Sequence, residues 1–140
     1  IKIIVLGGFG FIGSRVVDKL KETNHNVFPM SRQNGLDLLN YNSTVENFSK
    51  VNPDVIINCA THVGSVHYVT EYAADVFYDN SLMILNIYRA VKNNFNKTLV
   101  INPIANCLYP SGFTKLAESD LFNGDIHDSV YGFGHTRRIL

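Results

Sequence analysis

The stretch that decides the fold is Ile1–Gly13, IKIIVLGGFGFIG, at the start of the chain. Its apolar run Ile1–Leu6 predicts a β-strand buried on both faces, and apolar residues at helical spacing predict a helix over Phe11–Glu22. The glycines between them fit GxGxxG counted from Gly8 and GxxGxxG counted from Gly7. Residues without side chains allow a tight turn, close packing of helix on strand and close approach of a pyrophosphate to the backbone. Because the helix N-terminus also offers free N–H groups to phosphates, we expect a dinucleotide here rather than a purely structural loop.

The rest of the chain alternates apolar runs with helical patterns, which is typical of βαβ units and a parallel sheet. Ser43 to Glu46 has the form of a capping box, so a helix is expected to start at Ser43 and to stop before Pro53. The segment 103–128 is expected to be loop. The remaining predicted elements are strands at Asn26–Met30, Asp54–Ala60 and Thr98–Asn102, and helices at Asp75–Asn93 and from near Ser129. This order predicts an α/β fold, a doubly wound parallel sheet of the Rossmann type.

Composition limits the classes to which the protein can belong. The 140 residues fit one domain, so residues 1–140 are assigned to a single dinucleotide-binding domain. Twelve Lys and Arg balance twelve Asp and Glu, so no basic field attracts nucleic acid. No apolar run reaches the roughly 18 residues of a membrane span, and two cysteines are too few for a disulfide scaffold. These features favour a cytoplasmic location. The absence of an initiator Met and the helix-like ending suggest a domain that continues beyond residue 140.

The end of the second predicted strand indicates which nicotinamide cofactor binds. An Asp or Glu about 20 residues after the glycines usually binds a free ribose 2′-hydroxyl, whereas an Arg accommodates a 2′-phosphate. Residues 28–32, FPMSR, contain no acid and end in Ser31 and Arg32, whose hydroxyl and guanidinium suit a phosphate. We therefore predict NADP(H) in preference to NAD(H); the alternative is that Arg32 is a solvated surface charge. Asp37 is expected to bind the adenine amino group, or else to be an ordinary turn carboxylate.

The chain resembles the extended short-chain dehydrogenase/reductase family, the NAD(P)-dependent sugar-nucleotide epimerases, dehydratases and reductases. The glycine turn is shared across that family, and later segments are more specifically similar to its GDP-L-fucose synthase branch. Those segments are Asn52–Ala60 with His62–Val66, then Ala74–Asp75 with Tyr78–Asn80 and Asn86, and finally Asn106–Pro110 with Ala117–Ser119 and Leu121. The resemblance covers essentially the whole chain. It implies hydride transfer at C4 of a nucleotide-linked keto sugar.

The resemblance also implies a catalytic centre, from which this chain departs at two positions. Tyr131 matches the family's acid/base tyrosine, while His135, one helical turn on, stands at the family's Lys position. Ala105 stands at the Ser position, so the neighbouring Asn106 is expected to supply a hydrogen-bond donor instead. Cys107 matches a cysteine that acts as acid/base in epimerisation, or it is only a small residue at a strand end. The residues assigned to the cofactor are Gly7, Gly10, Phe11, Ile12, Gly13, Ser31, Arg32, Asp37, Leu38, Ala60, Asn80, Tyr131 and His135.

Two functions stay open from the sequence. One is a nucleotide-sugar epimerase/reductase, whose sugar site needs a portion that follows the Tyr131 helix. The other is a catalytically altered or inactive dinucleotide-binding protein with a sensing or regulatory role, which Ala105 and His135 favour. His62 and His67 are not expected to bind a metal, because no Cys or carboxylate cluster accompanies them. Surplus apolar residues around Asp75–Asn93, and the family's habit of pairing this helix with the last one, predict a homodimer.

Overall fold

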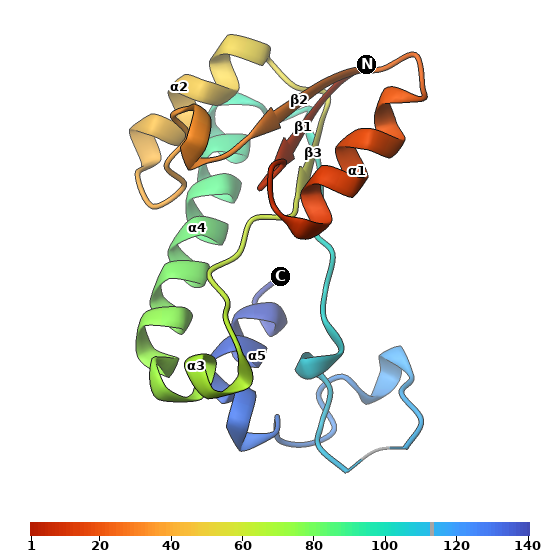
Figure 1. Cartoon of the computed structure of the whole chain (residues 1–140), viewed down its shortest axis with the longest axis vertical. Helices are drawn as coiled ribbons and strands as arrows, with labels where there is room; N and C mark the ends of the chain where they lie inside the picture. Colours follow the sequence, from red (N-terminus) through yellow and green to blue (C-terminus); the bar gives the residue numbers. More distant parts are fainter. Residues whose placement is uncertain (113) are drawn as a thin grey trace. The chain divides into compact units, whose positions relative to one another are not determined.

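A four-stranded parallel sheet is the centre of the fold in the computed structural model, which describes residues 1–112 and 114–140 (Figure 1). The strand order within these residues is β2-β1-β3-β4, so β1 lies in the interior of the sheet, as predicted. The strands are β1 (Lys2–Leu6), β2 (Asn26–Met30), β3 (Val55–Asn58) and β4 (Leu99–Ile101). Leu6 pairs with both Met30 and Asn58, so the carboxyl ends of three strands meet at one edge, directly before the glycine turn.

Helices cover both faces of the sheet, which confirms the doubly wound arrangement (Figure 1). On one face, Ile3 and Val5 of β1 pack against Val17 of α1 (Phe11–Lys21). On the other face, Ile4 and Leu6 belong to a larger cluster that includes residues of α2 (Tyr41–Val51) and α4 (Ala73–Asn94). The alternation follows from the pleat, because successive side chains of a strand point to opposite faces.

Helix α2 does not start where the sequence suggested. The capping-box pattern predicts a start at Ser43, but α2 begins at Tyr41 and Asn40 is its N-cap. The Asn40 side chain accepts a hydrogen bond from the Ser43 N–H at 3.0 Å, while the Ser43 hydroxyl accepts the Asp37 N–H at 3.0 Å. Asn is as good an N-cap as Ser, so the earlier residue caps the helix and Ser43 instead secures the preceding loop.

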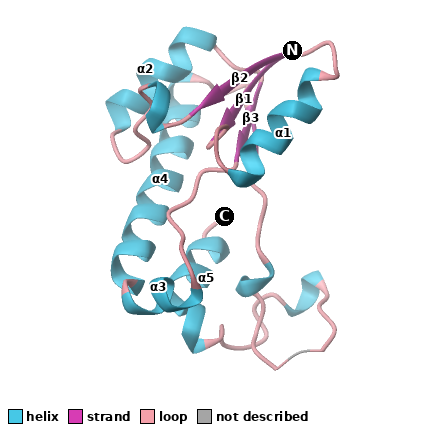
Figure 2. Cartoon of the chain, in the orientation of Figure 1, coloured by secondary structure: helices cyan, strands magenta, loops and turns pink. Residues whose placement is uncertain are grey.

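Residues outside the sheet region form short helices and turns (Figure 2). Helix α3 (Val66–Glu71), which the sequence analysis does not predict, is capped by Ser65, whose hydroxyl accepts the Tyr68 N–H at 3.2 Å. The expected loop after β4 contains 3₁₀ turns, and a further turn at Asp128–Val130 leads into α5 (Tyr131–Arg138). The last helix therefore begins close to the predicted position.

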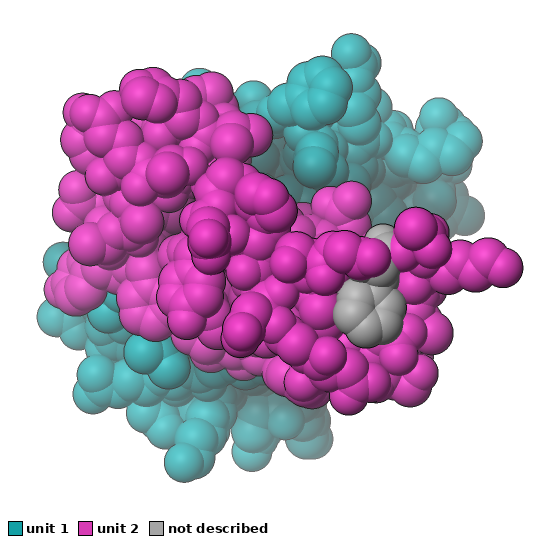
Figure 3. All heavy atoms as spheres, turned by 90° about the horizontal axis from the view of Figure 1, so that it is seen from below, with its two compact units in different colours: residues 1–61, 82–103 teal, residues 62–81, 104–140 magenta. Residues whose placement is uncertain are grey.

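The chain divides into two compact units, which Figure 3 distinguishes by colour. The sheet unit comprises residues 1–61 and 82–103, and the helical unit comprises residues 62–81 and 104–140. The boundary falls within α4, between Ser81 and Leu82. None of the helices in the described part of the chain combines the length and the apolar character that a membrane span requires.

Candidate functional site

The glycine turn of the sheet unit has the conformation that its sequence predicts. Gly7 follows β1 with a φ of +67°, in the left-handed region that favours glycine. A Cβ on Gly7 would lie 2.8 Å from the Cys59 carbonyl oxygen and 2.9 Å from the Ala60 Cα. The turn therefore passes close to the backbone after β3, and Ala60, one of the predicted cofactor residues, lies beside it.

The start of α1 packs closely on the same turn. The Gly10 N–H donates to the Gly7 carbonyl oxygen at 2.8 Å, and a Cβ on Gly13 would lie only 2.1 Å from that oxygen. Such a distance to a backbone atom excludes any side chain at Gly13 without a shift of the helix. The two glycines thus fix how α1 leaves the edge of the sheet.

The N-terminus of α1 is suited to bind an anion. Its N-cap is Gly10, and no side chain in the described part of the chain caps this end of the helix. The first amides of a helix have no partner within it, and the helix dipole adds partial positive charge there. Phe11 and Ile12, the first two residues of α1, are exposed. Their N–H groups, with that of Gly13, form the cradle in which a pyrophosphate would fit.

Ser31 and Arg32 follow β2 at the same edge of the sheet. Ser31 caps a 3₁₀ turn at Arg32–Asn34, and its hydroxyl oxygen accepts the Gln33 N–H at 3.1 Å. The Asn34 side chain completes the turn by accepting the Ser31 N–H at 2.8 Å. Arg32 is exposed, and within the described residues its guanidinium takes part in no ion pair that would hold it away from a ligand. Both residues therefore lie directly after β2, where the sequence analysis predicts a 2′-phosphate site.

Asp37 and Leu38 differ in what they offer. Asp37 is exposed, and its Oδ1 accepts the Leu39 N–H at 3.0 Å, as a turn carboxylate commonly does. Leu38 is buried, and its carbonyl oxygen accepts a hydrogen bond from the Asn86 side chain at 2.9 Å. The structure thus shows the turn role of Asp37 directly, whereas its contact with adenine stays a prediction.

A chain of amide and hydroxyl groups, which the sequence analysis missed, lies at the carboxyl ends of β3 and β4. The buried Asn58 donates to the Asn102 side-chain oxygen at 3.0 Å, and Asn102 donates to the Tyr88 hydroxyl at 2.8 Å. The Asn58 oxygen also accepts the Ala60 N–H at 3.2 Å. The signal that could have found these residues is a polar side chain at the end of each predicted strand.

Tyr131 and His135 lie together in the helical unit. Both are on α5, and their rings meet edge to face with 4.4 Å between centroids, which confirms the shared face predicted from their spacing. The Tyr131 side chain is exposed, whereas the His135 Nε2 is buried and has no hydrogen-bond partner among the described residues. An unsatisfied buried nitrogen is costly unless a partner reaches it. The pair therefore combines an accessible phenol with a ring nitrogen that a ligand hydroxyl could satisfy.

Cys107 and its neighbour Asn106 differ in how far their side chains are exposed. Cys107 is half-buried in a 3₁₀ turn at Asn106–Leu108, and the Asn106 side chain is exposed. Burial raises the pKa of the Cys107 thiol above its usual value, and the Arg137 guanidinium partly opposes that shift. Arg137 is buried and also lies 4.8 Å from the centre of the Phe133 ring. Cys107 is thus a protonated thiol at neutral pH, with a cation nearby that sequence reasoning did not assign to it.

Asn80 has a structural role in addition to the cofactor role predicted for it. Its side chain is buried, accepts the His62 N–H at 3.0 Å and donates to the His62 carbonyl at 2.7 Å. The Asn80 oxygen also accepts a hydrogen bond from Arg137 Nη2 at 3.0 Å. These contacts hold the segment after β3 against α4 and α5 within the helical unit.

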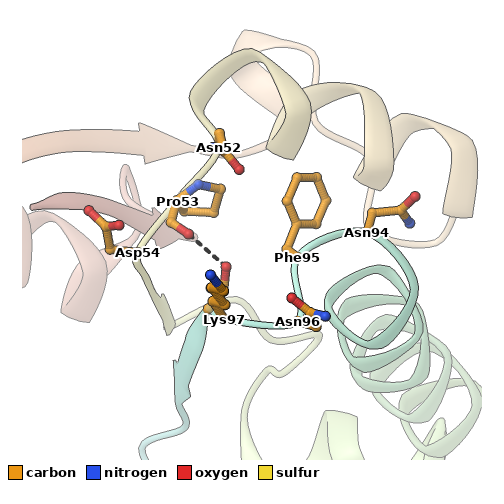
Figure 4. A pocket seen from close by; sticks show the side chains of 8 residues that line it. Asn52, Pro53, Asp54, Asn94, Phe95, Asn96 and Lys97 are labelled. Carbon is orange, nitrogen blue, oxygen red and sulfur yellow. Dashed lines mark hydrogen bonds between the residues drawn. The ribbon is translucent and has the colours of Figure 1, made fainter.

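A pocket elsewhere in the sheet unit is distinct from the glycine turn (Figure 4). It has a volume of about 220 Å³ and lies where β3 and β4 begin, at the opposite edge of the sheet from Gly7. Pro53, Asp54 and Phe95 line it, and the Thr98 hydroxyl donates to the Pro53 carbonyl there at 2.6 Å. Among the described residues, no group of three or more His, Cys, Asp or Glu is arranged so that it could hold a metal ion.

Comparison with known proteins agrees with this geometry. The NAD dependent epimerase/dehydratase family matches residues 3–136. GDP-L-fucose synthase of Dictyostelium discoideum is 27% identical over 141 residues, which cover 99% of this chain and 44% of that protein. GDP-L-fucose synthase 1 of Arabidopsis thaliana is 31% identical over 110 residues, which cover 78% of this chain and 33% of that protein.

A solved structure extends the comparison to three dimensions. A GDP-D-glycero-L-gluco-heptose synthase from Campylobacter jejuni, crystallised in the presence of NADPH, aligns with a TM-score of 0.87 and 26% identity. The alignment covers 99% of this chain and 40% of that protein. The chain thus spans less than half the length of each of these relatives.

Proposed function

Because the chain belongs to the NAD dependent epimerase/dehydratase family, we propose that it is the cofactor-binding part of an NADP(H)-dependent nucleotide-sugar epimerase/reductase. The observation that carries the proposal is the glycine turn, in which Gly7, Gly10 and Gly13 bring the uncapped start of α1 to the carboxyl edge of the sheet. That arrangement binds dinucleotides in open α/β sheets. Relatives named as GDP-L-fucose synthases support a nucleotide sugar as the substrate class.

The residues of the sheet unit fit NADP(H) at two places. The N–H groups of the first turn of α1 would hold the pyrophosphate, as a helix N-terminus without a side-chain cap allows. Ser31 and Arg32 would hold the 2′-phosphate, to which a guanidinium can bind through two hydrogen bonds. In the helical unit taken by itself, a ligand hydroxyl would satisfy the buried Nε2 of His135. NADPH, when bound, supplies the hydride for C4 of the sugar.

The proton chemistry falls to side chains of the helical unit. Tyr131 donates a proton to the C4 oxygen of the keto sugar, and the exposed Asn106 amide orients that oxygen in place of a serine hydroxyl. Cys107, whose pKa is raised by burial, is suited to donate a proton during epimerisation rather than to abstract one at neutral pH. The roles of Tyr131 and Cys107 rest on positions that match the family's motif, whereas that of Asn106 rests on its place beside Ala105.

The decisive experiment is to assay NADPH oxidation by the full-length protein with a panel of nucleotide-linked 4-keto sugars, GDP sugars first. We expect turnover with at least one sugar, and we expect Tyr131→Phe to lower kcat by about 10²- to 10⁴-fold, the usual contribution of a positioned proton donor. The Kd for NADPH, measured by fluorescence, should change far less than kcat in this variant. A kcat that is unaffected by Tyr131→Phe would contradict the assigned role.

A second candidate function is favoured by Ala105 and His135, which stand where the family has Ser and Lys. An imidazole carries less positive charge near neutral pH than a lysine ammonium, so it stabilises a tyrosine phenolate less well. A dinucleotide-binding protein with a sensing role would bind NADPH and turn over none of the sugars. Tight NADPH binding together with absent turnover would therefore support this second function over the first.

A further inference from the structure

Three polar side chains of the helical unit form a hydrogen-bonded chain that the proposed function does not use. His62 Nδ1 lies 2.8 Å from Asp79 Oδ2, and His62 Nε2 lies 2.8 Å from the Tyr68 hydroxyl. His62 comes from the segment after β3, Tyr68 from α3 and Asp79 from α4. A carboxylate, an imidazole and a hydroxyl are thus linked in the order found in proteins that activate a hydroxyl with a carboxylate-oriented histidine.

The direction of the hydrogen bonds follows from what each group can donate. An ionised carboxylate only accepts, so Asp79 requires that Nδ1 of His62 carries the proton. In the neutral imidazole Nε2 is then an acceptor, and the Tyr68 hydroxyl must donate to it. Asp79 therefore fixes the tautomer of His62 in which His62 can take the proton of Tyr68.

The surroundings hold this chain in one geometry. Asn80 binds the His62 backbone through both its N–H and its carbonyl, at 3.0 and 2.7 Å. Gly64 lies against the Tyr68 ring, since a Cβ there would lie 2.7 Å from a ring carbon. The His62 and Asp79 side chains are 29% and 28% exposed, so they are partly shielded from water and still accessible to a small molecule. Partial shielding from water makes the hydrogen bonds of His62 with Asp79 and Tyr68 stronger than they would be on an open surface.

We propose that Tyr68 is a base-activated nucleophile, with His62 as its base and Asp79 as the group that orients the base. When a small electrophile with a sulfonyl or acyl centre meets Tyr68, the phenol oxygen forms a bond to that centre and the leaving group departs with the electron pair of its bond. The phenol proton passes to His62 Nε2, and Asp79 stabilises the resulting imidazolium without becoming protonated itself. The site is separate from the catalytic roles assigned to Tyr131 and needs neither cofactor nor sugar, so it can fail or succeed independently of the proposed function.

An aryl sulfonyl fluoride tests this reactivity on the full-length protein, with peptide mass spectrometry to measure the labelling rate of each tyrosine. Tyr68 should react faster than Tyr72, whose ring stacks on it with 4.9 Å between centroids and which serves as the internal reference. We expect His62→Gln to slow labelling of Tyr68 by about a hundredfold, the lower end of what a positioned general base contributes. Labelling of Tyr72 should not change.

A matched control is His67→Gln, which removes a histidine of α3 that is highly exposed and pairs, within the described residues, with Glu71 on the same helix. This variant should leave the rate at Tyr68 unchanged. Asp79→Asn should slow it in the same direction as His62→Gln but by less, and ¹⁵N NMR should show that His62 loses its single tautomer. The proposal is overturned if Tyr68 reacts no faster than Tyr72, if its rate is the same in His62→Gln, or if wild-type His62 carries its proton on Nε2.

Discussion

The candidate sites of the two units consist of different chemical groups, mainly backbone in the sheet unit and side chains in the helical unit. In the sheet unit the site is mostly backbone, because glycines and the first amides of α1 form the cradle. In the helical unit the site is made of side chains, with Tyr131 and His135 in edge-to-face contact on α5 and Cys107 in a separate turn. A backbone site depends on conformation, whereas a side-chain site depends on the identity of every residue in it. The glycine pattern is complete in the sheet unit, whereas Ala105 and His135 depart from the resembled pattern in the helical unit.

The two units also differ in what stabilises them. The sheet unit has apolar clusters on both faces of the sheet, with residues such as Ile4 and Phe48 fully buried. Among the described residues, the helical unit has fewer buried apolar side chains, namely Val69, Val76, Leu108 and Ile126, beside its buried polar contacts of Asn80 with Arg137 and His62. Buried polar networks hold one geometry only while every member is paired. We therefore expect the helical unit to be the more sensitive of the two to conservative polar substitutions.

The largest effect is expected at Gly13, where the sheet unit can be broken by a single methyl group. Gly13→Ala places a Cβ 2.1 Å from the Gly7 carbonyl oxygen, so α1 must move away from the turn. We expect the free energy of unfolding to fall by about 3 kcal/mol, the upper part of the usual range for overpacking, and dinucleotide binding to be lost. Urea denaturation and fluorescence titration with NADPH measure the two effects.

Gly35→Ala is the control for that substitution. Gly35 has a φ of +92°, but a Cβ there would meet nothing within 4 Å. The variant should lose only about 1–2 kcal/mol from backbone strain and should still bind NADPH. Equal losses of stability in the two variants would show that the close packing of α1 on the turn is not what Gly13 provides.

How much the sequence predicts depends on how local each contact is. The β1-turn-α1 unit was predicted correctly because its hydrophobic period and its glycines are adjacent in the chain. The start of α2 was wrong because Asn40 and Ser43 are both good caps, and only the surrounding loop decides between them. The pairing of Asn58 with Asn102 could not be predicted, because it depends on which strands are neighbours in the sheet.

Arg32→Glu should have the next largest effect, a loss of NADPH affinity, and it tests whether one side chain of the sheet unit selects the cofactor. The proposed 2′-phosphate site is one of the few places in that unit where a side chain decides the ligand. A charged hydrogen bond contributes about 1.5–3 kcal/mol, so we expect NADPH to bind roughly ten- to a hundredfold more weakly and NADH to bind better than NADPH. Isothermal titration with both cofactors checks this. Unchanged affinities for both would leave Arg32 as a solvated surface charge.

Leu85 tests whether a second copy of the chain covers the exposed side of α4, as a homodimer would require. Phe77, Leu85 and Tyr88 of this helix are 41%, 58% and 40% exposed. In a two-fold interface each copy would bury the same residues. Leu85→Glu should therefore raise the dimer Kd about tenfold or more, because each copy would lose more than about 1 kcal/mol of binding free energy. Sedimentation velocity of the full-length protein measures it.

The exposed Asn42 on α2 is the matched control, because Asn42→Glu adds the same charge on a different helix. That variant should sediment like the wild type. If wild type, Leu85→Glu and Asn42→Glu are all monomeric at micromolar concentration, the homodimer is rejected and the apolar side of α4 has another role.

The smallest effect concerns the two thiols, one in each unit. Burial raises the pKa of both Cys59 and Cys107 in the folded protein. A group whose pKa is raised on folding contributes its full stabilisation below the unfolded value, about 8.5 for a thiol, and loses it as the pH rises further. The free energy of unfolding should therefore decrease above about pH 8.5, and Cys59→Ser and Cys107→Ser should each make that decrease less steep. Arg137 opposes the shift at Cys107 alone, so Arg137→Gln should make the decrease steeper only when Cys107 is present. An identical slope in Arg137→Gln with and without Cys107 would show that this cation does not act on the thiol. Burial alone would then account for the raised pKa of the cysteine in each unit.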